Sequence, residues 1–383
     1  MKNNIECQYR FSCGGCDLLE ADYCKQLEYK NQTTEKALAK ANIQYERLNS
    51  IVPSENITNY RNKIQYNYDI TRQGEILCGN YALGSHHLVS IDHCLLENEL
   101  SYKIKMYFLL LMKDFIILPH CNSQPNGSVK NLVIRTNFNL SEAMVIIVTN
   151  SSFFPKSKMI VNNLVKKFSQ IKSVVQIINN RHSGYILNGE SKLLYGNNYI
   201  KDVLCGLTYH ISPTSFFQVN HGQTERLYEA ALSLSKLTKD DLLLDAYCGI
   251  GTIGLTSASK VKEVLGIEIV SAAIEDARNN AERNKIKNVR YKVGDVSKVV
   301  ERIKDFHPTC VIVDPPRGGL SQKFIGYINY AKPSRLTYIS CNQKTLMRDL
   351  KQLSKNYEIK LIQPFDMFPL TRKIETLVTL CLK

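Results

Sequence analysis

The stretch LLLDAYCGIGTIG, residues 242–254, decides the fold of the second half of the chain. Its first residues form an apolar run that is typical of a strand buried on both faces of a parallel sheet. The glycines that follow let the backbone approach a ligand closely and then begin a helix. The stretch therefore predicts a strand, a ligand-binding turn and a helix, which together form the first unit of a doubly wound α/β sheet.

The sequence after this stretch repeats the alternation of strands and helices. Further strand-like runs cover residues 264–269, 289–295, 310–316 and 336–342, and a helix is expected over 271–284. Ligands bind doubly wound sheets at the carboxyl ends of the strands. The residues that end these runs are therefore the first candidates for a functional site.

Before residue 212, short strand-like runs dominate the sequence in place of alternating strands and helices. Short alternating runs, separated by turn residues, cover 64–70, 132–138, 143–149, 174–179 and 207–212. Such runs predict a mixed α+β domain with antiparallel pairing, with helices over 23–41 and 100–118. We therefore predict two domains: an α+β domain over 1–212 and a Rossmann-like catalytic domain over 213–383.

Charge and cysteine content narrow the class of protein. The 383 residues carry a formal net charge of +14, spread over both halves, which predicts a polyanionic partner such as nucleic acid. The N-terminal residues lack the apolar core of a secretion signal, and no apolar run is long enough for a membrane span. We therefore expect a cytoplasmic protein without a membrane partner, whose twelve cysteines stay reduced. No obligate protein partner is implied.

The glycine-rich turn and the next strand together predict a cofactor with a ribose. Glu268 ends that strand 19 residues after Gly249, where a carboxylate can accept hydrogen bonds from ribose hydroxyls. The pattern also fits NAD, but Asp245 at the mouth of the loop would repel a pyrophosphate and would suit an ammonium group. The chain also supplies one α/β unit rather than two mononucleotide-binding halves. These features favour S-adenosylmethionine.

The fourth and fifth strands of this half are followed by residues whose side chains can take part in binding or catalysis. Asp314 is followed by two prolines, which stiffen the turn and fix the carboxylate beside the ligand. The next residue is Arg317, whereas the enzymes that methylate exocyclic amines of nucleic acids carry an aromatic residue there. Cys341 follows the fifth strand on the same rim of the sheet.

A thiol at this place suits methylation at C5 of a pyrimidine. C5 is too weak a nucleophile to attack a methyl sulfonium, but addition of a thiolate to C6 makes it enolate-like. Methyl transfer leaves a proton on C5 that a base must remove before the thiolate can leave. Glu375, at the start of the last strand, is the best candidate for this base, and Cys341 for the nucleophile.

These motifs together resemble the RNA uracil-5 methyltransferase family over nearly the whole chain. The elements that carry the resemblance are SFFQVN (215–220), DAYCGIGTIG (245–254), GIEI (266–269), VDPPRGG (313–319), YISCN (338–342) and FPLTRKIE (368–375). The resemblance implies that Gln218, Tyr247, Glu268 and Asp314 contact S-adenosylmethionine. It also implies that Cys341 is the nucleophile and Glu375 the proton acceptor.

The resemblance also assigns a role to the cysteines of the N-terminal stretch CQYRFSCGGC (7–16). Their spacing alone leaves zinc and an iron–sulfur cluster open. The 23S rRNA branch of the family carries a [4Fe-4S] cluster, and the resemblance implies the ligands Cys7, Cys13, Cys16 and Cys94. Cys24 and Cys78 compete with Cys94 for the fourth position. We interpret the cluster as structural, because the reaction needs no redox step.

Three features depart from the family pattern. Only six residues precede Cys7, so the RNA-gripping N-terminal β-barrel of many members is expected to be absent. Gln343 stands where a proline is usual after Ser-Cys-Asn. Lys373-Ile374 stands where His-Val is usual before the base. The missing barrel weakens any inference about which RNA is bound.

The sequence therefore predicts an S-adenosylmethionine-dependent methyltransferase that forms 5-methyluridine in RNA, with 23S rRNA as the expected substrate. A tRNA uracil-5 methyltransferase is the first alternative, which the four cysteines oppose. A non-catalytic iron–sulfur RNA-binding module is the second, which Cys341 and Glu375 oppose.

Overall fold

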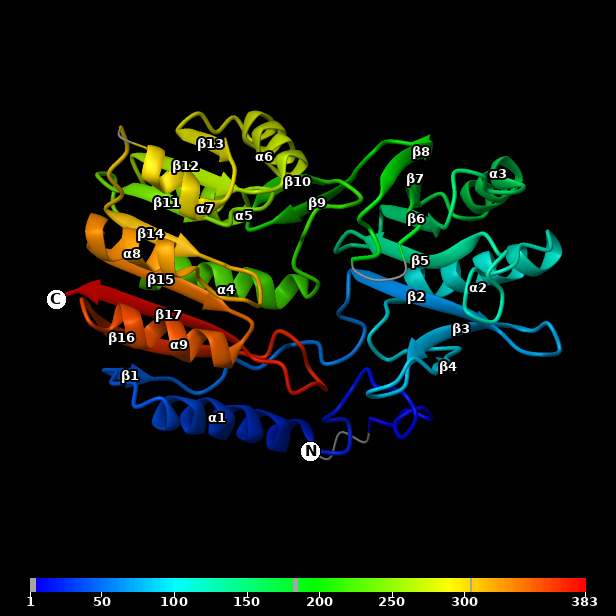
Figure 1. Cartoon of the computed structure of the whole chain (residues 1–383), viewed down its shortest axis with the longest axis horizontal. Helices are drawn as coiled ribbons and strands as arrows, with labels where there is room; N and C mark the ends of the chain where they lie inside the picture. The colour runs from blue at the N-terminus through cyan, green and yellow to red at the C-terminus, as the bar shows by residue number, and fades with distance from the viewer. Residues whose placement is uncertain (1–4, 182–184, 304) are drawn as a thin grey trace.

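The second half of the chain folds around an eight-stranded sheet, which confirms the predicted α/β architecture (Figure 1). The computed structural model describes residues 5–181, 185–303 and 305–383. From one edge to the other, the strands are β1 (Arg47–Leu48), β16 (Tyr357–Phe365), β17 (Glu375–Leu382), β15 (Arg335–Ser340), β14 (Cys310–Val313), β11 (Leu242–Ala246), β12 (Glu263–Glu268) and β13 (Val289–Val293).

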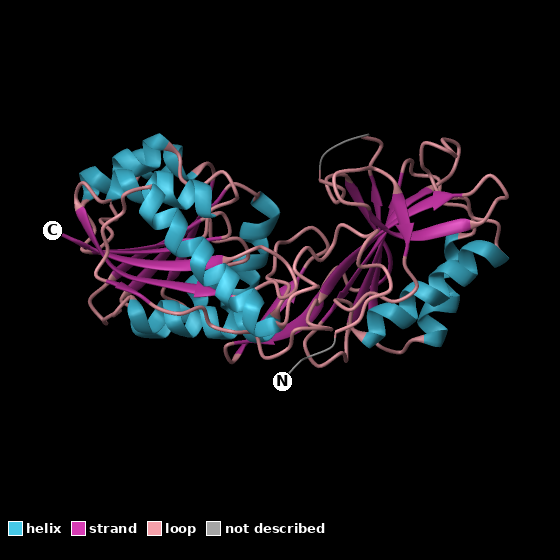
Figure 2. Ribbon diagram, turned by 90° about the horizontal axis from the view of Figure 1, so that it is seen from below, coloured by secondary structure: helices cyan, strands magenta, loops and turns pink. Residues whose placement is uncertain are grey.

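The five strands from β15 to β13 are parallel, and helices lie on both faces of the sheet (Figure 2). The helices are α4 (His221–Leu234), α5 (Thr252–Ser257), α6 (Ser271–Arg283), α7 (Val296–Val299), α8 (Gln322–Ala331) and α9 (Gln343–Leu353). Strand β17 runs antiparallel between β15 and β16. The first residue of β17 therefore lies at the edge where the parallel strands end.

The first half of the chain contains a separate seven-stranded sheet. Its strands, in order, are β4 (Leu88–Ser90), β3 (Ile76–Tyr81), β2 (Lys63–Ile70), β5 (Val129–Thr136), β6 (Ala143–Thr149), β7 (Ile171–Ile178) and β8 (Glu190–Gly196). All neighbours pair antiparallel except β6 and β7. Helices α2 (Glu99–Asp114) and α3 (Ser157–Lys167) cover one face (Figure 2). This confirms the predicted mixed α+β architecture.

The central strands of this sheet are apolar on both faces, and the two faces serve different cores. Ile134 of β5 packs with Phe108 of α2. Its neighbour Val133 points the opposite way, as alternate strand residues do, into a core that also contains Leu243 of β11. A hairpin of β9 (Ile200–Leu204) and β10 (Leu207–Ile211) contributes to that core. The two halves of the molecule therefore share one continuous apolar core.

The N-terminal segment, which precedes the seven-stranded sheet in sequence, packs against the eight-stranded sheet, which was not expected. Helix α1 (Tyr23–Lys40) contacts α9, and β1 pairs parallel with β16 of the second sheet. Leu38 and Ile43 are buried in the core of that sheet. The helix was expected from its sequence, but its apolar face does not specify which of two sheets it covers.

Within the part of the chain that the structure describes, no helix is both long enough and apolar enough to cross a membrane.

Candidate active site and cysteine pocket

A cavity of about 910 Å³ opens where the parallel strands of the eight-stranded sheet end. Strand ends of a doubly wound sheet are the expected place for a ligand. The cavity is lined by all six side chains that the sequence analysis assigned to cofactor binding and catalysis: Gln218, Tyr247, Glu268, Asp314, Cys341 and Glu375. These residues are spread over more than 150 positions of sequence, and the fold brings them to one place.

The glycine-rich loop after β11 forms one wall of this cavity. Tyr247, Gly249 and Gly251 all have positive φ, at 66°, 54° and 83°, so the chain turns sharply between the strand and α5. The backbone N–H of Gly249 donates to Glu268 Oε2 at 3.2 Å, and that of Val270 donates to Oε1 at 3.0 Å. These bonds hold the Glu268 carboxylate in place at the end of β12.

Asp245 has a different role from the one expected. Its side chain lies beneath the loop and does not line the cavity. Oδ2 accepts a 2.8 Å hydrogen bond from the backbone N–H of Gly254, and Oδ1 is buried without a partner among the described residues. Burial raises the pKa of this carboxyl to about 7, and Asp314 and Glu268 add to the shift. Asp245 therefore holds the start of α5 rather than facing a ligand ammonium.

Asp314 and Gln218 meet in the floor of the cavity. Gln218 Nε2 donates to Asp314 Oδ2 at 3.3 Å, although the two residues are 96 positions apart. Burial raises the pKa of Asp314 above its ordinary value, and the hydrogen bond from Gln218 opposes that rise. A buried carboxylate of this kind favours a cationic ligand, because the ligand replaces the lost interaction with water.

Cys341 and Glu375 lie at neighbouring positions of two antiparallel strands, and both line the cavity. Ser340 of β15 pairs with Thr376 of β17, so the next step of the register sets Cys341 against Glu375. Burial raises the pKa of Cys341 to about 11, and Glu375 and Asp314 add to the shift. Arg317 opposes it, because a nearby cation stabilises the thiolate.

The environment of Glu375 suits proton transfer. Burial, followed by the charge of Asp314, raises the pKa of its carboxyl well above the ordinary value. Its Oε1 atom is buried and has no hydrogen-bond partner among the described residues. A carboxyl with a raised pKa and a free oxygen can take a proton from a substrate held beside it.

The cavity also contains residues that the sequence analysis did not single out as site residues. They are Tyr185, Phe216, Phe368 and Lys373, among others. Phe216 is 62% exposed beside the cavity, which is unusual for a large aromatic residue and fits stacking on a base. Its place two residues before Gln218 in the SFFQVN motif was the only available signal.

A second pocket, of about 390 Å³, lies between the N-terminal segment and the first sheet. Cys7, Cys13, Cys16 and Cys94 all line it. Burial, followed by the charges of the other three cysteines and opposed by Arg61, raises the pKa of Cys16 to about 12. The competing residues do not line the pocket: Cys24 is exposed on α1 and Cys78 is buried on β3.

The donor set of this pocket fits a thiolate-bound metal group, because four thiols from two distant segments face one space. Among residues 5–181, 185–303 and 305–383, no three His, Cys, Asp or Glu side chains are placed as close together as metal ligands are. The structure therefore gathers the expected four cysteines without placing them at ligand distances from one ion.

Comparison with solved structures defines the class of protein. The chain superimposes on the Pyrococcus abyssi tRNA (uracil-54, C5)-methyltransferase, solved in complex with S-adenosyl-L-homocysteine, with a TM-score of 0.77 and 28% identity. The match covers 96% of this chain and 86% of that one. Together with the cavity at the strand ends, it defines an S-adenosylmethionine-dependent methyltransferase.

Sequence comparison identifies the family. Residues 140–383 match the family described as tRNA (Uracil-5-)-methyltransferase. An uncharacterized RNA methyltransferase of Staphylococcus epidermidis is 38% identical over 373 residues, covering 97% of this chain and 82% of the relative. One of Oceanobacillus iheyensis is 37% identical over 386 residues, covering 100% and 84%. The chain belongs to the RNA uracil-5-methyltransferase family, and its enzymatic activity is S-adenosylmethionine-dependent methylation of RNA.

Proposed function

We propose that this enzyme transfers a methyl group from S-adenosylmethionine to C5 of a uridine in 23S rRNA, with Cys341 as nucleophile and Glu375 as base. The observation that carries this proposal is the register of β15 and β17, which sets the thiol against the carboxyl in the cavity that Asp314 also lines. One group must attack C6 and another must reach the proton on the neighbouring atom C5, so the two groups have to lie close together in one cavity.

The proposed reaction has three steps. The Cys341 thiolate adds to C6, and the electron pair of the C5–C6 double bond moves toward C5 and O4. C5 then attacks the methyl carbon, and the carbon–sulfur bond of the sulfonium breaks to give S-adenosylhomocysteine. Glu375 finally takes the C5 proton, the double bond re-forms, and the thiolate leaves.

The remaining cavity residues are proposed to hold the cofactor. Glu268, fixed by two backbone N–H groups, would accept the ribose hydroxyls. Tyr247, Gln218 and Asp314 line the same cavity, and Asp314 is proposed to face both the methyl donor and the uracil. A cationic cofactor also matches the buried carboxyl groups of Asp314 and Glu375 in the cavity.

We further propose that residues 1–212 bind RNA and residues 213–383 carry out catalysis, in the cytoplasm. The net charge of +14 supports a polyanionic substrate. The target uridine must leave its stack to reach Cys341, which favours a uridine in a loop or bulge.

The choice between 23S rRNA and tRNA rests on the cysteine pocket. Four cysteines around one space favour the rRNA branch of the family. The likeness to the Pyrococcus abyssi tRNA enzyme favours tRNA as the second candidate. Mapping 5-methyluridine in rRNA and tRNA from cells that lack this protein tests the choice. We expect loss of the modification from 23S rRNA with tRNA unchanged, and loss from tRNA alone would contradict the proposal.

We also propose that Cys7, Cys13, Cys16 and Cys94 hold a [4Fe-4S] cluster. When bound, the cluster would tie the N-terminal segment to the loop around Cys94 and would take no part in methyl transfer. Cys7, Cys16 and Cys94 also pack with Leu19, Leu96 and Leu370, so the segment is already part of a small apolar core.

Anaerobically purified protein is expected to be brown, with about four irons and four sulfides per chain. Cys94→Ala is expected to lose both the colour and the iron, because it removes a ligand. Cys24→Ala is the matched control, since Cys24 is exposed and outside the pocket, and it should keep them. Stoichiometric zinc without sulfide would contradict the proposal.

A further inference from the structure

The loop that joins β16 to β17, residues 366–374, precedes the proposed base directly. Phe365 pairs with Glu375, so this strand pair joins the two ends of the loop. Phe368 and Lys373 of the loop line the active-site cavity. The position of Glu375 therefore depends on how the loop is held.

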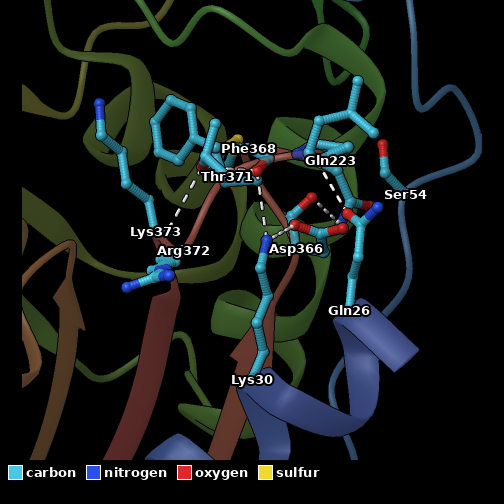
Figure 3. Close-up of polar contacts among 12 residues, drawn as sticks. Gln26, Lys30, Ser54, Gln223, Asp366, Phe368, Thr371, Arg372 and Lys373 are labelled. Carbon is cyan, nitrogen blue, oxygen red and sulfur yellow. Dashed lines mark hydrogen bonds and ion pairs between the residues drawn. The ribbon is translucent and has the colours of Figure 1, made fainter. Parts of the chain in front are cut away.

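A buried ion pair holds the first residue of the loop (Figure 3). Lys30 of α1 contacts Asp366, and both side chains have no exposure to solvent. Tyr23 donates a 2.8 Å hydrogen bond to Asp366 Oδ2, and its oxygen accepts one of 2.7 Å from the backbone N–H of Ser54. Lys30 Nζ also donates to the carbonyl of Phe368 at 3.2 Å. One lysine from a distant helix thus fixes the loop at two points.

Further hydrogen bonds from α1 and from the region of α4 complete the attachment. Gln26 Oε1 of α1 accepts from the backbone N–H of Leu370 at 3.1 Å. Gln223 Nε2 of α4 donates to the carbonyl of Asp366 at 3.2 Å, as Figure 3 shows. Asn220 Nδ2 donates to the carbonyl of Met367 at 3.1 Å. Side chains therefore bind the backbone of the loop as well as its one buried carboxylate.

The loop also contacts the segment that carries three of the four pocket cysteines. The backbone N–H of Leu18 donates to the carbonyl of Leu370 at 3.0 Å. The backbone N–H of Arg372 donates to Asp17 Oδ1 at 2.7 Å. Lys373 lines both the cysteine pocket and the active-site cavity. The loop therefore connects the cysteine pocket with the active-site cavity.

Glu375 needs this support more than Cys341 does. The Oε1 atom of Glu375 has no partner among the described residues, so its placement depends on the backbone that carries it. Cys341 follows β15 and precedes α9, which are separate from the loop. A shift of the loop would move the base away from C5 and leave the nucleophile in place.

We propose that Lys30 and Asp366 are positioning residues that hold the 366–374 loop so that Glu375 reaches the C5 proton. This inference rests on the proposed role of Glu375. Loss of the ion pair should slow the last step, proton removal and release of the thiolate, more than the addition and methyl transfer that precede it. The enzyme would then accumulate as a methylated covalent complex with RNA.

Single-turnover and steady-state assays with labelled S-adenosylmethionine and a uridine-containing RNA test this proposal in Asp366→Asn and Lys30→Met. Turnover is expected to fall by about tenfold or more, since small displacements of a catalytic group are costly. The methylated covalent fraction should rise, while its rate of formation stays close to that of the wild type. The double variant Lys30→Met/Asp366→Asn removes both charges, avoids a lone buried charge, and should behave in the same way.

Asp241→Asn is the matched control. It breaks the largely buried Asp241–Arg335 ion pair just before β11, at the opposite end of the parallel strands. It should lower thermal stability without raising the covalent fraction. If the Lys30 and Asp366 variants fold and show a wild-type covalent fraction, the proposal is overturned. Glu375→Gln, assayed in parallel, separates the two claims: if it accumulates the complex and the Lys30 and Asp366 variants do not, only the positioning role is wrong.

Discussion

Cys341→Ala is expected to abolish methyl transfer, with a loss on the order of 10⁴-fold or more, the scale seen when a covalent nucleophile is removed. Without the thiol nothing adds to C6, and C5 stays too weak a nucleophile to attack the sulfonium. Transfer of labelled methyl from S-adenosylmethionine to RNA measures the loss. No covalent protein–RNA species should form either.

Cys381→Ala is the matched control for this substitution. Cys381 lies near the far end of β17, outside the active-site cavity, and is also partly buried. Its loss should leave activity near that of the wild type. If Cys341→Ala methylates RNA at a rate comparable to that of Cys381→Ala, C6 addition by this thiol is not the mechanism.

Glu375→Gln is expected to stop the reaction after methyl transfer instead of before it. The amide keeps the shape of the side chain but cannot take the C5 proton, so the thiolate cannot leave. Turnover should fall by about 10²-fold or more, the usual contribution of a positioned base. A methylated protein–RNA complex that survives denaturing electrophoresis should accumulate.

Glu358→Gln controls for the loss of one carboxylate. Glu358 is an exposed residue of β16, and its side chain pairs with Lys360 at 2.7 Å. It should turn over normally and accumulate no complex. Normal turnover by Glu375→Gln would mean that another group removes the proton.

Much of the fold could be predicted because its strands are apolar runs separated by clear turns. The runs at 64–70 and 143–149 coincide with β2 and β6 to within a residue. The glycine-rich turn after β11 is equally local, because glycine adopts the positive φ found at Gly249 and Gly251 at little cost. Local signals of this kind carry over directly from sequence to structure.

The partners of the N-terminal segment could not be predicted in this way. The sequence of α1 favours a helix, but Lys30 meets Asp366 across 336 positions of sequence. No local pattern encodes a pairing over that distance. A lysine in a helix is usually solvated, so its complete burial gave no sequence signal.

In the candidate site, too, the positions of residues along the strands could be predicted from the sequence, but the direction of one side chain could not. The rule that ligands bind at strand ends correctly gathered Glu268, Asp314 and Cys341, because each directly follows or ends a strand. Asp245 obeys the same rule in sequence, yet its side chain turns under the loop to bind Gly254. The direction of one side chain depends on the packing of its neighbours, which a motif does not record.

The most direct test of the central claim is the mass of the Glu375→Gln protein after incubation with a uridine-containing RNA and S-adenosylmethionine. We predict a covalent complex that contains one RNA and one transferred methyl group, joined through the peptide that contains Cys341. The double variant Cys341→Ala/Glu375→Gln should form none. A complex joined through another residue, or one that also forms without Cys341, would contradict the proposed mechanism.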